Sequence, residues 1–165
     1  MKKIIDRIYV GDDDDDAKAV ERGFSILVSC KDCIGGHREI LGYHTMSAPQ
    51  GPNYLWVEKG KRMSLNCIDS ADPNMIPWEM LQHGLEFAVT RYIAGDSILF
   101  HCRAGHSRGP TTALLFLRSI GEMPHPFQAS ERVFKTLYSL YDPGQGMRQT
   151  AKSHWNEIEN QFIAE

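Results

Sequence analysis

The chain has 165 residues, of which 42% are hydrophobic and 24% are charged, and a formal net charge of −3. This length and composition predict one globular domain, residues 1–165, with a substantial core. The weakly acidic balance gives no overall positive field for nucleic acid or for an anionic membrane. We therefore expect no nucleic-acid partner and no membrane partner. A monomer is also expected.

The amino terminus does not follow the pattern of a secretory leader. Asp6 and Arg7 interrupt the apolar residues that follow Lys2 and Lys3 before a hydrophobic region forms. No uninterrupted apolar run approaches the ~18 residues needed to cross a bilayer. The 4 cysteines are too few for the disulfide scaffold of a secreted domain of this size. These features predict a cytoplasmic protein.

Short elements are predicted for the first 28 residues. Strands at Ile4–Ile5 and Ile8–Val10 precede a helix over about residues 14–22, and an apolar strand follows at Phe24–Val28. The carboxylates of Asp12–Asp16 point in different directions in a continuous run, so they cannot converge on one metal ion. We interpret them as helix-capping residues that complement the helix dipole.

A second candidate metal site, at Cys30 and Cys33, also lacks a complete set of ligands. Cys30 and Cys33 are spaced like zinc ligands, and His37 is near them in the sequence. Only Cys67 remains as an extra thiol outside the motif described below, so the sequence offers no complete set of four ligands. We expect no metal site and no cofactor.

Residues 34–62 form a long, irregular connection rich in glycine and proline, with an additional strand at Tyr54–Val57. Long loops often line functional sites. The candidates for substrate contact in this loop are His37, Arg38, His44 and Trp56. For each of them, the favoured interpretation is a packed loop with solvent-facing polar residues.

An acidic loop follows a predicted strand at Met63–Ile68. A carboxylic acid at the end of a strand is well placed to protonate a leaving oxygen, which contributes about 10²- to 10⁴-fold to a reaction rate. Asp69 is favoured as this general acid over Asp72, because Asp72-Pro73 fits ordinary turn chemistry. The alternative interpretation of Asp69 is a cap at the end of the strand.

The second half of the chain alternates helices with one buried strand. Helices are predicted from Pro77 to Ala94, from Pro110 to Gly121, over Phe127–Tyr141 and over Met147–Phe162, and the strand at Ile98–His101. Together with the first half, this order predicts an α/β fold. Its central, mostly parallel sheet is flanked by helices.

The loop between the buried strand and the following helix carries a cysteine and an arginine five residues apart. A loop in front of a helix N-terminus points backbone N–H groups inward and attracts a tetrahedral oxyanion. Gly105 allows the tight turn, and the planar fork of Arg108 can clamp two phosphate oxygens. The same donors stabilise a thiolate at Cys102 and make it nucleophilic. The predicted phosphate-binding residues are Arg103, Ala104, Gly105, His106, Ser107 and Arg108.

The sequence HCRAGHSR at residues 101–108 resembles the signature of the cysteine-dependent protein tyrosine phosphatases. Its second half, AGHSR, is most similar to the dual-specificity branch of that superfamily. The segment from Ile8 to Asp12 resembles the "LYVG" start of these phosphatases, and Pro143–Gln149 resembles their "PNxGF" turn and following glutamine. The resemblance implies a dual-specificity phosphatase-like fold.

The resemblance also implies a mechanism for phosphotyrosine and for phosphoserine and phosphothreonine monoesters. Cys102 attacks phosphorus to form a phosphocysteine while Asp69 protonates the leaving group, and Asp69 then activates water. Arg108 and the loop amides hold the phosphate oxygens. By the same resemblance, Ser107 hydrogen-bonds the departing thiolate, and His101 orients the loop and tunes the cysteine. The expected partner is a phosphorylated protein or peptide.

A redox role is implied for Cys30. Its place at the end of a strand resembles that of the cysteine that lies behind the catalytic cysteine in several related phosphatases. Cys30 is therefore the candidate redox partner of Cys102, with Cys33 and Cys67 as competitors. A buried, inert thiol is the alternative interpretation of Cys30.

Three other functions share the same loop. An RNA 5′-triphosphatase and a phosphoinositide phosphatase use the same chemistry, and a pseudophosphatase binds phosphopeptides without turnover. The loop lacks the extra basic residues that lipid-directed relatives often carry between Gly105 and Arg108. The presence of Cys102, Asp69 and Ser107 together with Arg108 disfavours a pseudophosphatase.

Overall fold

The structure is a computed structural model that describes residues 1–161. Within these residues, six strands form one sheet in the order β1-β2-β6-β3-β5-β4. The strands are β1 (Lys2–Ile5), β2 (Ile8–Gly11), β3 (Ser25–Val28), β4 (Trp56–Lys59), β5 (Arg62–Leu65) and β6 (Ile98–His101).

The four inner strands run parallel, and the two edge strands are antiparallel to their neighbours. His101, the last residue of β6, pairs with Gly11 on one side and with Val28 on the other. The predicted, mostly parallel sheet is confirmed. The carboxyl ends of β2, β3, β5 and β6 therefore meet at one edge of the sheet, where open α/β folds bind ligands.

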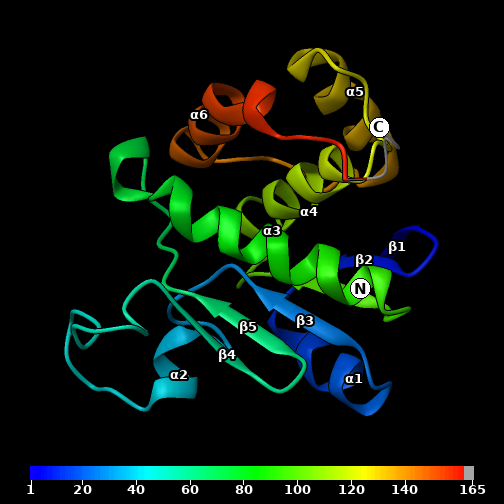
Figure 1. The fold of residues 1–165 in the computed structure, drawn as a ribbon. Helices are drawn as coiled ribbons and strands as arrows, with labels where there is room; N and C mark the ends of the chain where they lie inside the picture. The colour runs from blue at the N-terminus through cyan, green and yellow to red at the C-terminus, as the bar shows by residue number, and fades with distance from the viewer. Residues whose placement is uncertain (162–165) are drawn as a thin grey trace.

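Helices cover both faces of the sheet (Figure 1). One face packs against α1 (Asp16–Glu21) and α2 (His37–Leu41), and the other against α3 (Trp78–Ile93) and α4 (Arg108–Ser119). Outside α4 lie α5 (Phe127–Leu137) and α6 (Gln145–His154). Among residues 1–161, no helix is both long and apolar enough to cross a membrane.

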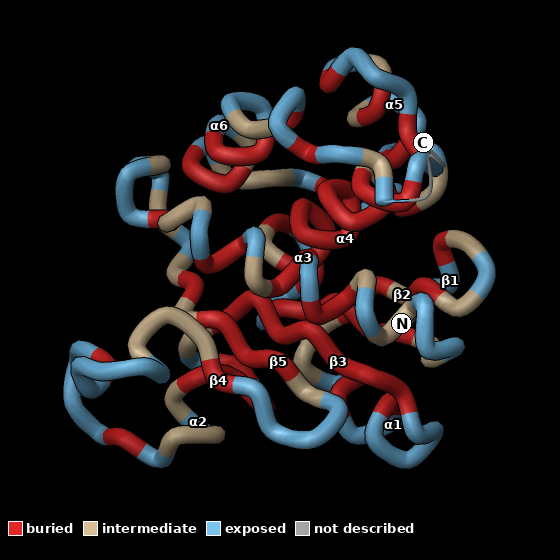
Figure 2. Tube along the Cα trace, in the orientation of Figure 1, coloured by how far each residue is buried: buried red, intermediate tan, exposed pale blue. Residues whose placement is uncertain are grey.

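The helix α4 is the centre of the core. It contacts β6 and β2 on one side and α3, α5 and α6 on the others, so the whole run Ala113–Leu117 is buried (Figure 2). Side chains of β6 alternate between the two faces of the sheet, as a strand requires. Ile98 and Phe100 join the core on the α4 side, and Leu99 joins a smaller cluster on the α1 side.

Several boundaries differ from the sequence predictions. The predicted strand at Tyr54–Val57 is shifted to β4, because Gly60, with φ of +61°, makes the turn of a hairpin with β5. The short helix α2 was not predicted. The helix α4 begins at Arg108 rather than at Pro110, and it tolerates proline there because the first four helical N–H groups have no partner within the helix.

The last two helices are shorter than predicted. The chain leaves α5 at Tyr138, where ψ is 91°, and the Tyr138 hydroxyl donates a hydrogen bond to the carbonyl of Gly105. After α6, a 3₁₀ turn at Trp155–Glu157 ends at Ile158 in an extended conformation. Phe162, the predicted end of the last helix, lies outside the described residues.

Candidate active site

The loop from Cys102 to Ser107 joins the end of β6 to the first residue of α4. Gly105 has φ of +74°, a conformation that glycine adopts without strain. A Cβ atom at Gly109 would lie 2.8 Å from the carbonyl carbon of His101 and 2.9 Å from the Cys102 nitrogen. Since no such atom is present, the first turn of α4 packs directly against the start of the loop. The loop is therefore fixed at both ends.

The candidate nucleophile lies in front of the N-terminus of α4. Cys102 is a free cysteine and is 3% exposed. The free N–H groups of the first turn of α4 and its helix dipole make this end of the helix positive. The site thus offers donors both to a thiolate and to a bound phosphate.

Two polar side chains of the loop are held by neighbouring segments. Arg108 donates one hydrogen bond of 3.0 Å from Nη1 to the carbonyl of Cys67, which leaves its other N–H groups for a ligand. The Ser107 hydroxyl accepts a hydrogen bond of 2.8 Å from the Gly144 amide. Because Ser107 accepts there, its own O–H proton remains available to donate.

The two candidate acids differ in what they contact. A Cβ atom at Gly144 would lie 3.2 Å from Asp69 Oδ1 and 3.5 Å from Ser107 Oγ, so this carboxylate and this hydroxyl flank the same glycine. Asp72 instead accepts a hydrogen bond of 2.9 Å from the Asn74 amide and caps a 3₁₀ turn. Asp69 therefore lies beside the loop, and Asp72 serves the turn chemistry that its sequence predicts.

The remaining loop residues, 103–106, differ in their exposure and in their hydrogen-bond partners. The Arg103 side chain donates to the carbonyl of Asp32, and His106 Nδ1 lies 3.1 Å from the carbonyl of Leu140. Arg103, Ala104 and His106 are exposed, whereas Gly105 is buried. The side chains of Arg103 and His106 are therefore directed to neighbouring segments, and Arg108 is the basic side chain of the loop that is left for a phosphate.

His101 is fully buried behind the loop. Its Nε2 lies 2.7 Å from Asp16 Oδ2, and Asp16 accepts two more hydrogen bonds, of 2.6 and 2.8 Å, from Arg62. Burial alone would raise the pKa of Asp16, but the hydrogen bonds from Arg62 and then His101 lower it to about 2. Neither Asp16 nor Arg62 was predicted to reach the site, because the run of five carboxylates does not reveal which one turns inward.

The cysteine predictions need one correction. Cys30 forms a disulfide with Cys33, since the loop after β3 brings their Cα atoms to 5.6 Å. Cys30 lies in the same buried cluster as Cys102, but it is not a free thiol for Cys102 in this state. Cys67 is free, and burial raises its pKa to about 12, so its thiol stays neutral. No three His, Cys, Asp or Glu side chains gather as metal ligands in residues 1–161.

His37 and Trp56, two of the four candidates in the 34–62 loop, have structural contacts. His37 is fully buried, with one ring nitrogen 3.0 Å from the Tyr43 hydroxyl and the other 2.7 Å from the carbonyl of Asn53. Trp56 stacks on His83, with ring centroids 3.7 Å apart. These contacts fit the favoured interpretation of a packed loop.

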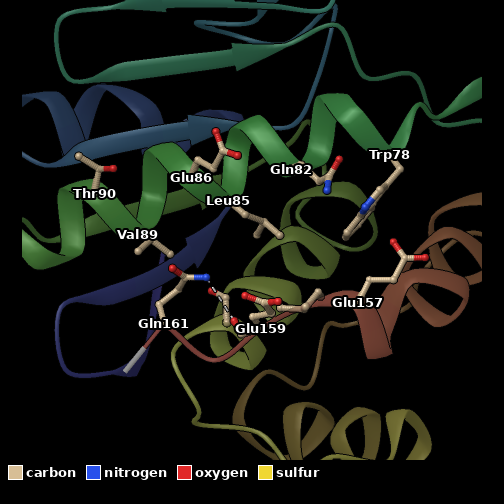
Figure 3. Close-up of a pocket in the computed structure, with 11 residues that line it drawn as sticks. Trp78, Gln82, Leu85, Glu86, Val89, Thr90, Glu157, Glu159 and Gln161 are labelled. Atoms are coloured by element: carbon tan, nitrogen blue, oxygen red, sulfur yellow. Dashed lines mark hydrogen bonds between the residues drawn. The ribbon is translucent and has the colours of Figure 1, made fainter. Parts of the chain in front are cut away.

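A separate cavity of about 360 Å³ lies at the opposite end of α4. Figure 3 shows Leu85 and Val89 of α3 pointing toward the segment that carries Glu159 and Gln161. Its acidic lining residues, Glu86, Glu157 and Glu159, make it unsuitable for a phosphate group. The candidate active site is therefore the loop at the N-terminus of α4.

Comparison with protein-family models and with curated protein sequences finds no match. Solved structures do match. The human tyrosine phosphatase-like serine/threonine/tyrosine-interacting protein is 13% identical, with a TM-score of 0.67 over 95% of this chain and 96% of that one. DUSP15 is 16% identical, with a TM-score of 0.64 over 94% and 86% of the two chains. PTPMT1 in complex with PI(5)P is 15% identical, with a TM-score of 0.62 over 94% of each chain. The chain therefore has the fold of the dual-specificity phosphatases, as predicted.

Proposed function

We propose that this chain is a phosphatase that hydrolyses phosphate monoesters through a phosphocysteine intermediate. The observation that carries the proposal is the position of Cys102 and Arg108 at the two ends of a loop that closes on the N-terminus of α4. Such a loop binds the three non-bridging oxygens of a phosphate through its amides and the arginine. It also stabilises the thiolate that attacks phosphorus.

In the first step, the Cys102 sulfur forms a bond to phosphorus while the bond to the leaving oxygen breaks. Asp69 supplies the proton that the leaving oxygen needs, and its place beside Ser107 and Gly144 supports this role. Arg108 and the loop amides stabilise the charge on the transferring phosphoryl group.

In the second step, a water molecule attacks the phosphocysteine and the sulfur–phosphorus bond breaks. Asp69, now ionised, accepts the proton of that water. Ser107 donates its O–H to the departing thiolate of Cys102. The hydrogen bond that Ser107 accepts from Gly144 supports this role, because it orients the hydroxyl and leaves its proton free.

The proposed substrate is a phosphorylated protein or peptide, and the proposed setting is the cytoplasm, where the chain acts as a monomeric single domain. The fold does not choose the substrate, since both a tyrosine phosphatase-like protein and PTPMT1 bound to PI(5)P share it. Between Gly105 and Arg108 stand only His106 and Ser107, and the His106 ring faces the carbonyl of Leu140. A phosphoinositide headgroup carries several phosphates, and these two residues add no fixed positive charge to bind them.

Turnover of an aryl phosphate, and then of phosphotyrosine, phosphoserine and phosphothreonine peptides, tests this function. Cys102→Ser is expected to abolish turnover and to keep phosphopeptide binding, because the loop amides and Arg108 remain. Cys67→Ala is the matched control and should keep turnover, since Arg108 uses the backbone carbonyl of Cys67. Unchanged turnover in Cys102→Ser contradicts the mechanism. Turnover only of RNA 5′-triphosphates or phosphoinositides contradicts the substrate class.

A further inference from the structure

A buried charge network lies directly behind Cys102. The Asp16 side chain is 6% exposed, the Arg62 side chain 15% and the His101 side chain 0%. These residues come from α1, β5 and β6, so three separate elements bring them together. Two nitrogens of Arg62 donate hydrogen bonds to the two carboxylate oxygens of Asp16. This bidentate geometry holds the carboxylate in the plane of the guanidinium.

Each ring nitrogen of His101 lies near an oxygen that accepts hydrogen bonds. Its Nε2 lies 2.7 Å from a carboxylate oxygen of Asp16, and its Nδ1 lies 3.3 Å from the backbone carbonyl of Cys102. An ionised carboxylate and a carbonyl accept hydrogen bonds and cannot donate them. A ring that carries an N–H at both nitrogens satisfies both acceptors, and the imidazolium form of histidine has these two N–H groups.

The other charged groups around this network bind partners other than His101. On α1, Asp15 is bound by the terminal amino group of Met1 and by Lys18. The loop after β3 contributes only the carbonyl of Gly35, which accepts from Arg62. Arg108 donates to Cys67. Among the bonds of the described residues, Asp16 is the one carboxylate that meets His101.

We propose that Asp16 is a positioning residue that, braced by Arg62, keeps His101 as an imidazolium against the backbone of Cys102. This inference rests on the proposed function. Arg62 and Asp16 cancel each other's charge, so the network leaves one positive charge, on the residue next to Cys102. That charge stabilises the Cys102 thiolate, and the N–H donated to the Cys102 carbonyl holds the start of the loop.

Replacing Asp16 by asparagine removes the negative charge that holds the second proton on His101. The neutral ring then loses its charge and one of its two donated hydrogen bonds. The Cys102 thiolate loses a neighbouring cation in a buried site, and such a change shifts a titration by about one pH unit or more.

The test measures the rate at which iodoacetamide alkylates Cys102 as a function of pH, by mass spectrometry of the Cys102 peptide from the full chain. In Asp16→Asn, the pH of half-maximal rate is expected to rise by about one unit relative to the wild type. Asp15→Asn is the matched control, since it removes a buried carboxylate of the same run that does not touch His101. Its profile should follow the wild type.

Two further variants make the result specific. In a His101→Asn background, Asp16→Asn should cause no additional shift, because the group through which it acts is absent. If Asp16→Asn alone fails to fold because Arg62 is left unpaired, Asp16→Asn with Arg62→Gln removes that charge and carries the same expectation.

The outcomes separate this inference from the proposed function. A wild-type midpoint near the ordinary cysteine value of about 8.5 overturns the proposed function, because Cys102 is then no better than a free thiol. A low wild-type midpoint that Asp16→Asn leaves in place, or moves equally in the His101→Asn background, overturns only the role of Asp16.

Discussion

The two ends of α4 differ in the charge that surrounds them. At its N-terminus, the phosphate-binding loop, Arg108 and the free N–H groups of the helix all favour an anion. At its C-terminus, the cavity lined by Glu86, Glu157 and Glu159 adds negative side chains to the negative end of the same helix dipole. The presence of a cavity therefore does not identify the site in this molecule. The direction of the helix dipole and the charges that complement it do.

The largest expected effect distinguishes the two arginines of α4. Arg108→Gln is expected to lower kcat for an aryl phosphate by about 10³-fold or more, because the charge on the transferring phosphoryl group loses its cation. Arg118→Gln, at the other end of the helix, should leave kcat within about twofold. Equal losses in the two variants, at matched thermal stability, would show that the arginines act only on the fold.

The two acidic residues of the loop after β5 are expected to differ in their effect on kcat. Asp69→Asn is expected to lower kcat by about 10²-fold or more on phenyl phosphate and far less on p-nitrophenyl phosphate, whose leaving group needs no proton. Asp72→Asn should change both rates little, because Asp72 caps a turn. The reverse ranking would assign the acid to Asp72.

The local pattern of strand, loop and helix made the site predictable. His101 to Arg108 is a continuous segment, so its residue types and spacing are visible without knowing what packs around it. The parallel order of the inner strands also follows from the alternation of apolar strands and helices. These features are encoded at short range in the sequence.

The supporting contacts could not be predicted in the same way. Asp16 and Arg62 are 46 positions apart, and their pairing depends on how β5 lies beside β3. The disulfide between Cys30 and Cys33 depends on the conformation of a glycine-rich loop, and Tyr138 reaches Gly105 only because the chain leaves α5 there. Each contact is set by tertiary packing and not by local propensity.

A smaller effect concerns one glycine in the first turn of α4 and another just after its last residue. In Gly109→Ala, the new Cβ atom would press on the backbone of His101 and Cys102, which cannot move without disturbing β6. We expect the free energy of unfolding to fall by about 1–3 kcal/mol in urea titrations and kcat to fall as well. In Gly121→Ala, the new atom meets the side chain of Asn160, and the positive φ of +80° costs about 1 kcal/mol. Its kcat should be unchanged. A loss of kcat in Gly121→Ala equal to that in Gly109→Ala would contradict the rigid contact between α4 and the loop.

The smallest effect concerns the pH dependence of the free energy of unfolding. It is expected from the buried carboxylate of Asp16 behind the loop and not from the exposed carboxylates at the other end of α4. The pKa of Asp16 is about 2 in the folded chain, below its ordinary value of 3.8. The unfolded chain therefore binds this proton first as the pH falls, and the ionised Asp16 stabilises the folded state fully above about pH 4. This stabilisation, about 2 kcal/mol, is lost as the pH falls from about 4 to about 2.

Urea unfolding at several pH values measures the loss. In a His101→Asn background, which removes the imidazole as a second titrating group, Asp16→Asn is expected to lower the stability at pH 6, and this loss should shrink toward pH 2, because asparagine has no proton to bind. Glu157→Gln is the control, since Glu157 is exposed and pairs with His154 on the surface. Its curve should stay parallel to that of the wild type. A constant difference between the His101→Asn chain with and without Asp16→Asn, from pH 6 to pH 2, would show that Asp16 contributes by packing alone, and that its charge does not stabilise the fold behind Cys102.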